Sequence, residues 1–189
     1  MRLFVAILLS DAVRRGIGSA LDDFPVTDPP WRWAEAATWH ITIKFLGETP
    51  PARLERVIAA LQGVAPRHAA FDLTLGAFGA FPNLRAPRVL FFDAANGVVP
   101  CTALAADVDA ALFDAIGLAR ETRPFHAHAT VARVKDRLPG DITRRLALVP
   151  PLTDAVTRVD GFALMESRLQ RTGARYATVK EFAFSRGGC

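Results

Sequence analysis

Two short stretches, His40-Ile41-Thr42-Ile43 and His128-Ala129-Thr130-Val131, repeat one pattern: histidine, an apolar residue, threonine and a second apolar residue. The two histidines are 88 positions apart (128 minus 40). In a β-strand, residues i and i+2 point to the same side. Each stretch therefore places an imidazole and a hydroxyl on one face and two apolar side chains on the other. We expect two strands whose apolar faces lie in the core.

The segments around the first motif recur around the second at the same offset. Shifting the first half of the chain by 88 residues brings nearly every expected element onto or beside a counterpart. We therefore interpret the 189 residues as a single domain with an internal repeat, approximately 1–88 and 89–189. The sequence predicts strands at about 3–9, 39–46, 70–78, 89–92, 126–134, 155–164 and 177–184, and helices at about 11–22, 50–61, 102–116 and 141–148.

The composition is that of a packed globular protein, with 51% hydrophobic and 22% charged residues. No apolar run approaches the ~20 residues that a membrane helix needs, so we expect no membrane association. Two cysteines do not make a disulfide framework, and this usage predicts a cytoplasmic protein. The net charge of +4 permits an anionic partner without requiring one.

If each repeat forms one lobe and the two lobes face each other, the paired motifs bring two histidines and two threonines to one cleft. Histidine has a pKa near 6.5, so one ring can take a proton from water while the other gives one to a leaving oxygen. Threonine hydroxyls can hold the non-bridging oxygens of a phosphate. This set of groups can open a cyclic phosphodiester without a metal. The near-symmetry of the motifs leaves open which histidine is the acid.

The motifs at 40–43 and 128–131 resemble those of the 2H phosphoesterase superfamily, which is defined by two His-x-Thr-x motifs. The stretches around them narrow the resemblance to the RNA 2′,3′-cyclic phosphodiesterase family, whose bacterial members are also described as 2′–5′ RNA ligases. The similarity covers essentially the whole chain. The stretches that carry it are residues 3–7, 39–48 and 78–82, and Ser167-x-Leu169 through Gly173-x-x-Tyr176.

This resemblance implies an α+β fold with two pseudo-symmetric lobes, each an antiparallel sheet with helices, and a cleft between them. It implies hydrolysis of RNA 2′,3′-cyclic phosphate ends to a 2′-phosphate, with reversible 2′–5′ ligation as the reverse reaction, and with no metal or other cofactor. By the same resemblance His40 is the proton donor, His128 is the proton acceptor, and Thr42 and Thr130 bind the phosphate. The expected partner is RNA with a 2′,3′-cyclic phosphate terminus, tRNA fragments included, and we expect no obligate protein partner.

The sequence departs from the family pattern at Ala127, where family members commonly have proline before the second histidine. The change loosens the entry to the strand but removes no reactive group.

Several further residues are candidates for substrate contacts. Arg133 follows His128 by five positions, so an ideal strand would send it to the opposite face, and a phosphate contact requires a bulge or a strand end. The family pattern has arginine there. Phe45 and Trp33 either stack on bases, as in readers of single-stranded RNA, or pack in the core.

His126 shares its strand face with His128 and either lines the cleft or supports it from the surface. The two could also be read as metal ligands, but a zinc site needs three or four ligands and the chain has no cysteine cluster. Lys44 is four positions after His40, so an ideal strand places both side chains on the same face. Lys44 either approaches the substrate phosphate or lies at a solvated strand end. Arg32 and Arg85 are loop cations that either guide RNA or serve solubility.

Two other functions remain as alternatives. One is a 2H phosphodiesterase acting on a small cyclic nucleotide, such as a cyclic phosphate of ADP-ribose. The other is a non-catalytic module that binds RNA ends, although the intact motifs argue against lost catalysis. The chain has no G-x-x-x-x-G-K-[ST] loop to hold ATP phosphates, so any ligation would be nucleotide-independent.

Overall fold

The structure is a computed structural model that describes residues 1–24, 30–152, 154–170 and 173–185. Residues 25–29 and Cys189 therefore lie outside the described residues. The described elements are β1 (Arg2–Leu8), α1 (Asp11–Leu21), β2 (Trp31–Trp33), β3 (His40–Glu48), α2 (Leu54–Val64), β4 (Phe71–Phe81), β5 (Val89–Asn96), α3 (Val98–Ile116), β6 (His128–Val134), α4 (Gly140–Leu146), β7 (Val156–Val159), β8 (Gly161–Gln170) and β9 (Gly173–Ala183).

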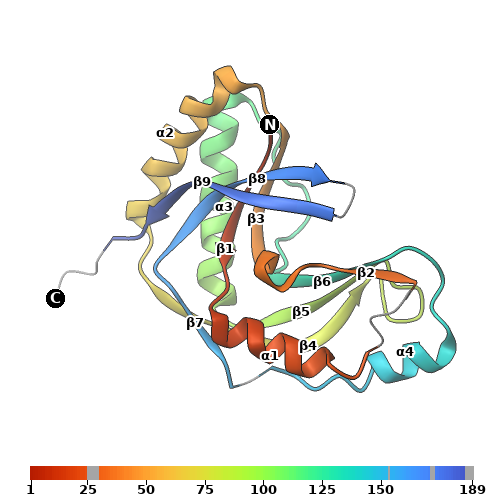
Figure 1. Cartoon of the computed structure of the whole chain (residues 1–189). Helices are drawn as coiled ribbons and strands as arrows, with labels where there is room; N and C mark the ends of the chain where they lie inside the picture. Colours follow the sequence, from red (N-terminus) through yellow and green to blue (C-terminus); the bar gives the residue numbers. More distant parts are fainter. Residues whose placement is uncertain (25–29, 153, 171–172, 186–189) are drawn as a thin grey trace.

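The described strands form one sheet with the order β7-β4-β5-β6-β3-β1-β8-β9, and β2 pairs with β6. Every pairing between these strands is antiparallel. In the middle of the sheet, β3 and β6 meet through the single residue pair Ile41 and Ala129. The sheet therefore divides into two strand groups, which diverge from this junction in Figure 1. The expected α+β class with antiparallel strands is confirmed.

The two strand groups are not the two halves of the sequence. β4, from the first half, pairs with β5 from the second, and β8, from the second half, pairs with β1 from the first. Each group thus combines strands from both sides of residue 88, because β2 and β4 of the first half join the group of β6, and β8 and β9 of the second half join the group of β3. Ile41 and Ala129, which form the junction, are themselves 88 positions apart (129 minus 41).

The helices cover the apolar face of the sheet. In α1 the side chains of Val13, Ile17 and Leu21 are buried in the main core, at the spacing expected for one helical face. The Ser10 side chain caps this helix by accepting a hydrogen bond from the Val13 amide. Helix α3 contacts both α2 and β3, and Figure 1 shows α2 and α3 side by side. No helix in the described ranges is long and apolar enough to cross a bilayer.

The prediction of one continuous strand at 155–164 is wrong. The segment 155–164 is two strands, β7 and β8, which pair with β4 and β1 respectively. The break falls at Asp160-Gly161, where a Cβ on Gly161 would lie 2.3 Å from the carbonyl oxygen of Phe182. Only glycine allows that close approach of the two backbones. The short strand β2 lies outside the predicted strands, because three residues are too few to establish a strand pattern even though Trp31, Arg32 and Trp33 alternate between apolar and polar.

Lys44 fastens β3 to α3 and to the loop before β6. Its Nζ donates to Oδ1 of Asp109 at 2.5 Å and to the Ala119 carbonyl at 3.0 Å. The Glu121 amide and the Arg120 guanidinium also donate to Asp109, at 3.1 Å and 3.4 Å. The Lys44 side chain is 10% exposed. It is therefore neither at a solvated strand end nor free to reach an anion.

These contacts make the stability depend on pH. Burial alone would raise the pKa of the Asp109 carboxyl, but its hydrogen bonds and the Lys44 charge lower that pKa below the usual value. A depressed folded-state pKa stabilises the fold above the unfolded pKa of about 3.9, and this stabilisation is lost as pH falls through the folded value. We expect Asp109→Asn to cost about 1.5 kcal/mol at pH 7.

Urea unfolding of both proteins at pH 7, 5 and 4 tests this, and the difference should shrink only toward the lowest pH. Asp114→Asn is the matched control, because Asp114 is exposed on the same helix and makes no ion pair with a described residue. An equal loss of stability in both variants would contradict the expectation.

Candidate active site

The junction between β3 and β6 brings the two repeated motifs together. An antiparallel register through its single pair aligns Thr42 with His128 and Thr130 with His40. The alternating apolar residues Ile41 and Ala129 are fully buried, so the motif histidines and threonines lie on the other face. These four side chains are half-buried: His40, Thr42, His128 and Thr130.

His40 is held from both sides of its ring. Its Nδ1 lies 2.6 Å from the Thr38 carbonyl oxygen, and its Nε2 lies 3.0 Å from Oγ1 of Thr42. A carbonyl can only accept, so Nδ1 carries hydrogen and Nε2 is the nitrogen that gains or loses a proton. The rings of Phe4 and Tyr176 are centred 5.0 Å and 5.4 Å from the His40 ring.

His128 repeats this arrangement in the other strand group. Its Nδ1 donates to the His126 carbonyl oxygen at 2.7 Å, which again leaves Nε2 to exchange a proton. The rings of Phe81 and Phe91 are each centred 5.1 Å from the His128 ring. Among the described residues, Nε2 of His128 has no hydrogen-bond partner, whereas Nε2 of His40 has Thr42.

Both histidines have a pKa below the usual value. For His40 burial is the main cause, the hydrogen bond to Thr38 opposes it, and the charge of His128 lowers the pKa further. For His128 burial again dominates and the hydrogen bond to His126 opposes it. The charge of His126 lowers that pKa, Asp93 raises it, and Arg133 lowers it. Mutual repulsion disfavours two protonated rings, which suits a pair in which one ring is an acid and the other a base.

Arg133 reaches the site face through a β-bulge. In the β5–β6 pairing Leu90 lies opposite Ala132 but Phe91 lies opposite Thr130, so one residue of β6 is extra. Val131 and Ala132 are consequently both buried, and Arg133 is exposed on the face of Thr130. A phosphate contact by Arg133 required a bulge or a strand end, and this bulge meets that requirement.

Phe45 reaches the same face through irregular pairing of β3 with β1. Phe45 lies opposite Phe4, and register shifts occur on both sides of this pair. The Phe45 side chain is 62% exposed, and its ring is centred 6.1 Å from that of Phe4. The Phe4 ring contacts both the Phe45 ring and the His40 ring, so Phe45 is exposed on the face of His40, as a substrate-contacting residue would be.

Trp33 does not lie with the other predicted site residues on the face of the motif histidines. It lies opposite buried Ala132, packs against the main core and meets Trp31 edge-on at 5.7 Å. His126 lies at the rim, where its Nε2 is 2.7 Å from Oδ1 of Asp93 and its ring is 5.6 Å from that of His128. In the described ranges, no three His, Cys, Asp or Glu side chains are grouped as metal ligands would be.

The aromatic side chains around the histidines were missed by the sequence reasoning as site residues. They come from four strands: Phe4, Phe81, Phe91 and Tyr176. One signal was present in the stretch 78–82. A Cβ on Gly79 would lie 2.7 Å from the Phe91 ring, so glycine there makes room for the ring that packs against His128.

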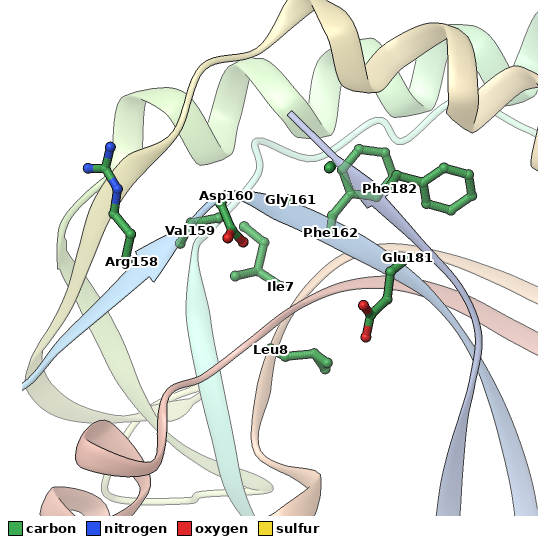
Figure 2. Close-up of a pocket in the computed structure, with 10 residues that line it drawn as sticks. Ile7, Leu8, Arg158, Val159, Asp160, Gly161, Phe162, Glu181 and Phe182 are labelled. Atoms are coloured by element: carbon green, nitrogen blue, oxygen red, sulfur yellow. The ribbon is translucent and has the colours of Figure 1, made fainter. Parts of the chain in front are cut away.

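A cavity of about 290 Å³ adjoins the site on the side of β1, β8 and β9. Leu8, one of its lining residues, pairs with His40 in the β1–β3 register. Figure 2 shows the Glu181 side chain extending toward Leu8, with Asp160 also on the wall. These carboxylates make this end of the site unfavourable for a further phosphate.

The chain is similar to known proteins over its whole length. The model of the LigT-like phosphoesterases matches residues 7–91. An RNA 2′,3′-cyclic phosphodiesterase of Thermus thermophilus is 33% identical over an alignment of 190 positions that covers 97% of this chain and 90% of the relative. One of Geobacillus stearothermophilus is 28% identical over 95% of this chain, which spans only 56% of that relative.

A crystal structure of a Thermus thermophilus protein has a TM-score of 0.81 and 30% identity, and the match covers 100% of both chains. Sequence, fold and the converging pair of His-x-Thr motifs thus lead to one assignment. The chain belongs to the LigT-like phosphoesterases of the 2H phosphoesterase superfamily.

Proposed function

We propose that the protein is an RNA 2′,3′-cyclic phosphodiesterase that forms a 2′-phosphate by acid–base catalysis between two histidines, without a metal. The observation that carries the proposal is the junction of β3 and β6, where both motif histidines use Nδ1 on a backbone carbonyl and keep Nε2 for proton exchange. The family relatives named for this activity support the same conclusion.

In this mechanism Nε2 of His128 takes a proton from water, and the water oxygen forms a bond to phosphorus. The bond between phosphorus and the 3′ oxygen breaks, and Nε2 of His40 gives its proton to that oxygen. The 2′ ester remains. The assignment of His128 as base is supported by its Nε2, which has no described partner and is open to water, while Thr42 occupies Nε2 of His40.

The phosphate oxygens are held by Thr42, Thr130 and Arg133, which stabilise the negative charge as it develops. Phe45 offers an exposed ring to the terminal base, and base stacking on aromatic rings is common in RNA recognition. The 2′–5′ ligation is the reverse path through the same groups. RNA with a cyclic phosphate end, tRNA fragments among them, is the proposed partner.

Removal of either histidine should abolish most of the activity. We expect His40→Ala and His128→Ala each to lower kcat/KM on a short RNA with a 2′,3′-cyclic phosphate end by about 10²–10⁴. His68→Ala is the matched control, because His68 pairs with Asp107 elsewhere in the fold and should keep wild-type turnover. The assay contains EDTA, and the product is tested for a 2′- or 3′-phosphate.

A 2′-phosphate formed in EDTA by wild type and by the His68 variant alone supports the proposal. A 3′-phosphate would contradict the assigned leaving group, and activity lost in EDTA would restore His126 and His128 as metal ligands. Turnover of small cyclic nucleotides with no turnover of RNA would favour the other phosphodiesterase activity.

The pH dependence should reflect the lowered pKa values of both histidines. Activity falls at low pH as the base becomes protonated and at high pH as the acid loses its proton, so the maximum should lie below about 6.5. Arg133→Gln removes a positive charge and should raise the pKa of His128, whereas Asp93→Asn should lower it. NMR titration of the imidazole protons measures both shifts, and shifts of the same sign would contradict the electrostatic account.

A further inference from the structure

We infer that the protein has a second anion-binding site, at Arg85 and Arg137, that binds phosphodiesters of RNA upstream of the reacting end. The inference rests on the proposed function, since it concerns the rest of the RNA chain. It also assigns a direction: the RNA leaves the reacting histidines along β6, away from β8 and β9.

The site is a hollow formed by two separate loops. Arg85, between β4 and β5, and Arg137, between β6 and α4, line it together with Leu138, Pro139, Gly140 and Thr143. Oδ1 of Asn83 accepts hydrogen bonds from the amides of Arg85 and Ala86, at 2.9 Å and 3.1 Å. This turn fixes the backbone from which Arg85 extends.

The same loops are fastened to the strands of the site. The Arg88 amide donates to the Phe81 carbonyl at 2.7 Å, and the Val134 amide donates to the Arg88 carbonyl at 2.9 Å. Phe81, whose ring packs against His128, thus lies at the base of the loop that carries Arg85. The hollow is therefore built on the strands that position His128, and not on an independent part of the surface.

The positive charges here have no local compensation. Five exposed cations on this surface make no ion pair with a described residue: Arg85, Arg88, Arg133, Lys135 and Arg137. By contrast, Arg168 on β8 of the other strand group pairs with Glu166 at 2.8 Å, and Arg158 on β7, at the far edge of the sheet, pairs with Asp72 at 3.0 Å. Uncompensated arginines repel one another, and a polyanion such as RNA relieves that repulsion.

The hollow is too far from the histidines to hold the reacting phosphate. Arg133, within β6, is the arginine assigned to the reacting phosphate, whereas Arg137 lies nine residues beyond His128 (137 minus 128) and follows the end of the strand at Val134. Figure 1 shows β6 leading away from its junction with β3 toward α4. Arg85 and Arg137 therefore contact other phosphates of the RNA chain, upstream of the reacting phosphate that Arg133 holds.

The opposite end of the site has the opposite charge. The cavity next to Leu8 is lined by Asp160, Glu181 and Arg158; the Arg158 charge is paired with Asp72, which leaves the two carboxylates to repel phosphates. Asp136 and Asp141 are the carboxylates nearest in sequence to Arg137, and neither lines the basic hollow. The contrast between the two ends favours an RNA path over the arginines.

The test compares two substrates with the same terminal nucleoside: a nucleoside 2′,3′-cyclic monophosphate and a short RNA ending in the same cyclic phosphate. For the variant Arg85→Ala/Arg137→Ala, we expect kcat/KM on the RNA to fall about tenfold at low salt. Turnover of the mononucleotide, which has no upstream phosphate, should change less than about twofold. The slope of log kcat/KM against log salt should decrease by about 1.4, as for two lost contacts to single-stranded RNA.

The matched control is Arg15→Ala/Arg53→Ala, which removes the same amount of positive charge. Arg15 is exposed on α1 and Arg53 is exposed just before α2, and these helices cover the apolar face of the sheet, opposite the histidines. It should leave both substrates unaffected. Arg85→Lys/Arg137→Lys keeps the charge and should recover most of the RNA turnover. Unchanged thermal unfolding shows that the variants fold.

The inference is overturned if Arg85→Ala/Arg137→Ala lowers kcat/KM equally for both substrates. It is also overturned if this variant, like the control, lowers kcat/KM for neither. Failure of the proposed function looks different, because wild type would then turn over neither substrate. In that case the affinity of wild type and hollow variant for RNA, measured by fluorescence anisotropy, still decides the inference. Equal affinities would overturn it.

Discussion

The single backbone pairing of Ile41 with Ala129 is the constraint on which the site depends. Both side chains are fully buried, so the junction is anchored in the core on one face while it supports the motif histidines and threonines on the other. Because β3 and β6 separate after one pair, the two strand groups diverge from the junction. A longer ladder would align the two strands fully and prevent this divergence.

Irregular pairing brings further residues to the site. The bulge at Val131 turns Arg133 toward the face of Thr130, and the register shifts in β3 turn Phe45 toward the site and Lys44 toward α3. Strict alternation along a strand would have exchanged the positions of Phe45 and Lys44. Bulges commonly occur next to active sites for this reason, since they re-aim single side chains without disturbing the core.

The sequence was sufficient to predict that the motif histidines and threonines share one strand face, and to predict most elements, because these features depend on patterns within one segment. It was insufficient for Phe4, whose contact with His40 arises from the pairing of β1 with β3, and for Tyr176, whose contact also needs the pairing of β1 with β8 and of β8 with β9. It also failed at Gly161, where the approach of Phe182 decides the break between β7 and β8. Contacts made between distant segments leave no periodic trace in either one. The division of the chain into repeats near residue 88 stays a prediction.

The crossing of β4 and β8 between the strand groups has a consequence for any shortened form of the protein. A fragment ending near residue 88 would retain β1 and β4 but lose β8 and β5, their hydrogen-bonded neighbours. Each would then be an open edge, and open edges recruit strands from other chains. Two such fragments could satisfy one another by reciprocal donation of β4, giving a domain-swapped dimer with a two-fold axis at the paired histidine strands. The intact chain carries out this swap within itself, so neither half is a complete folding unit.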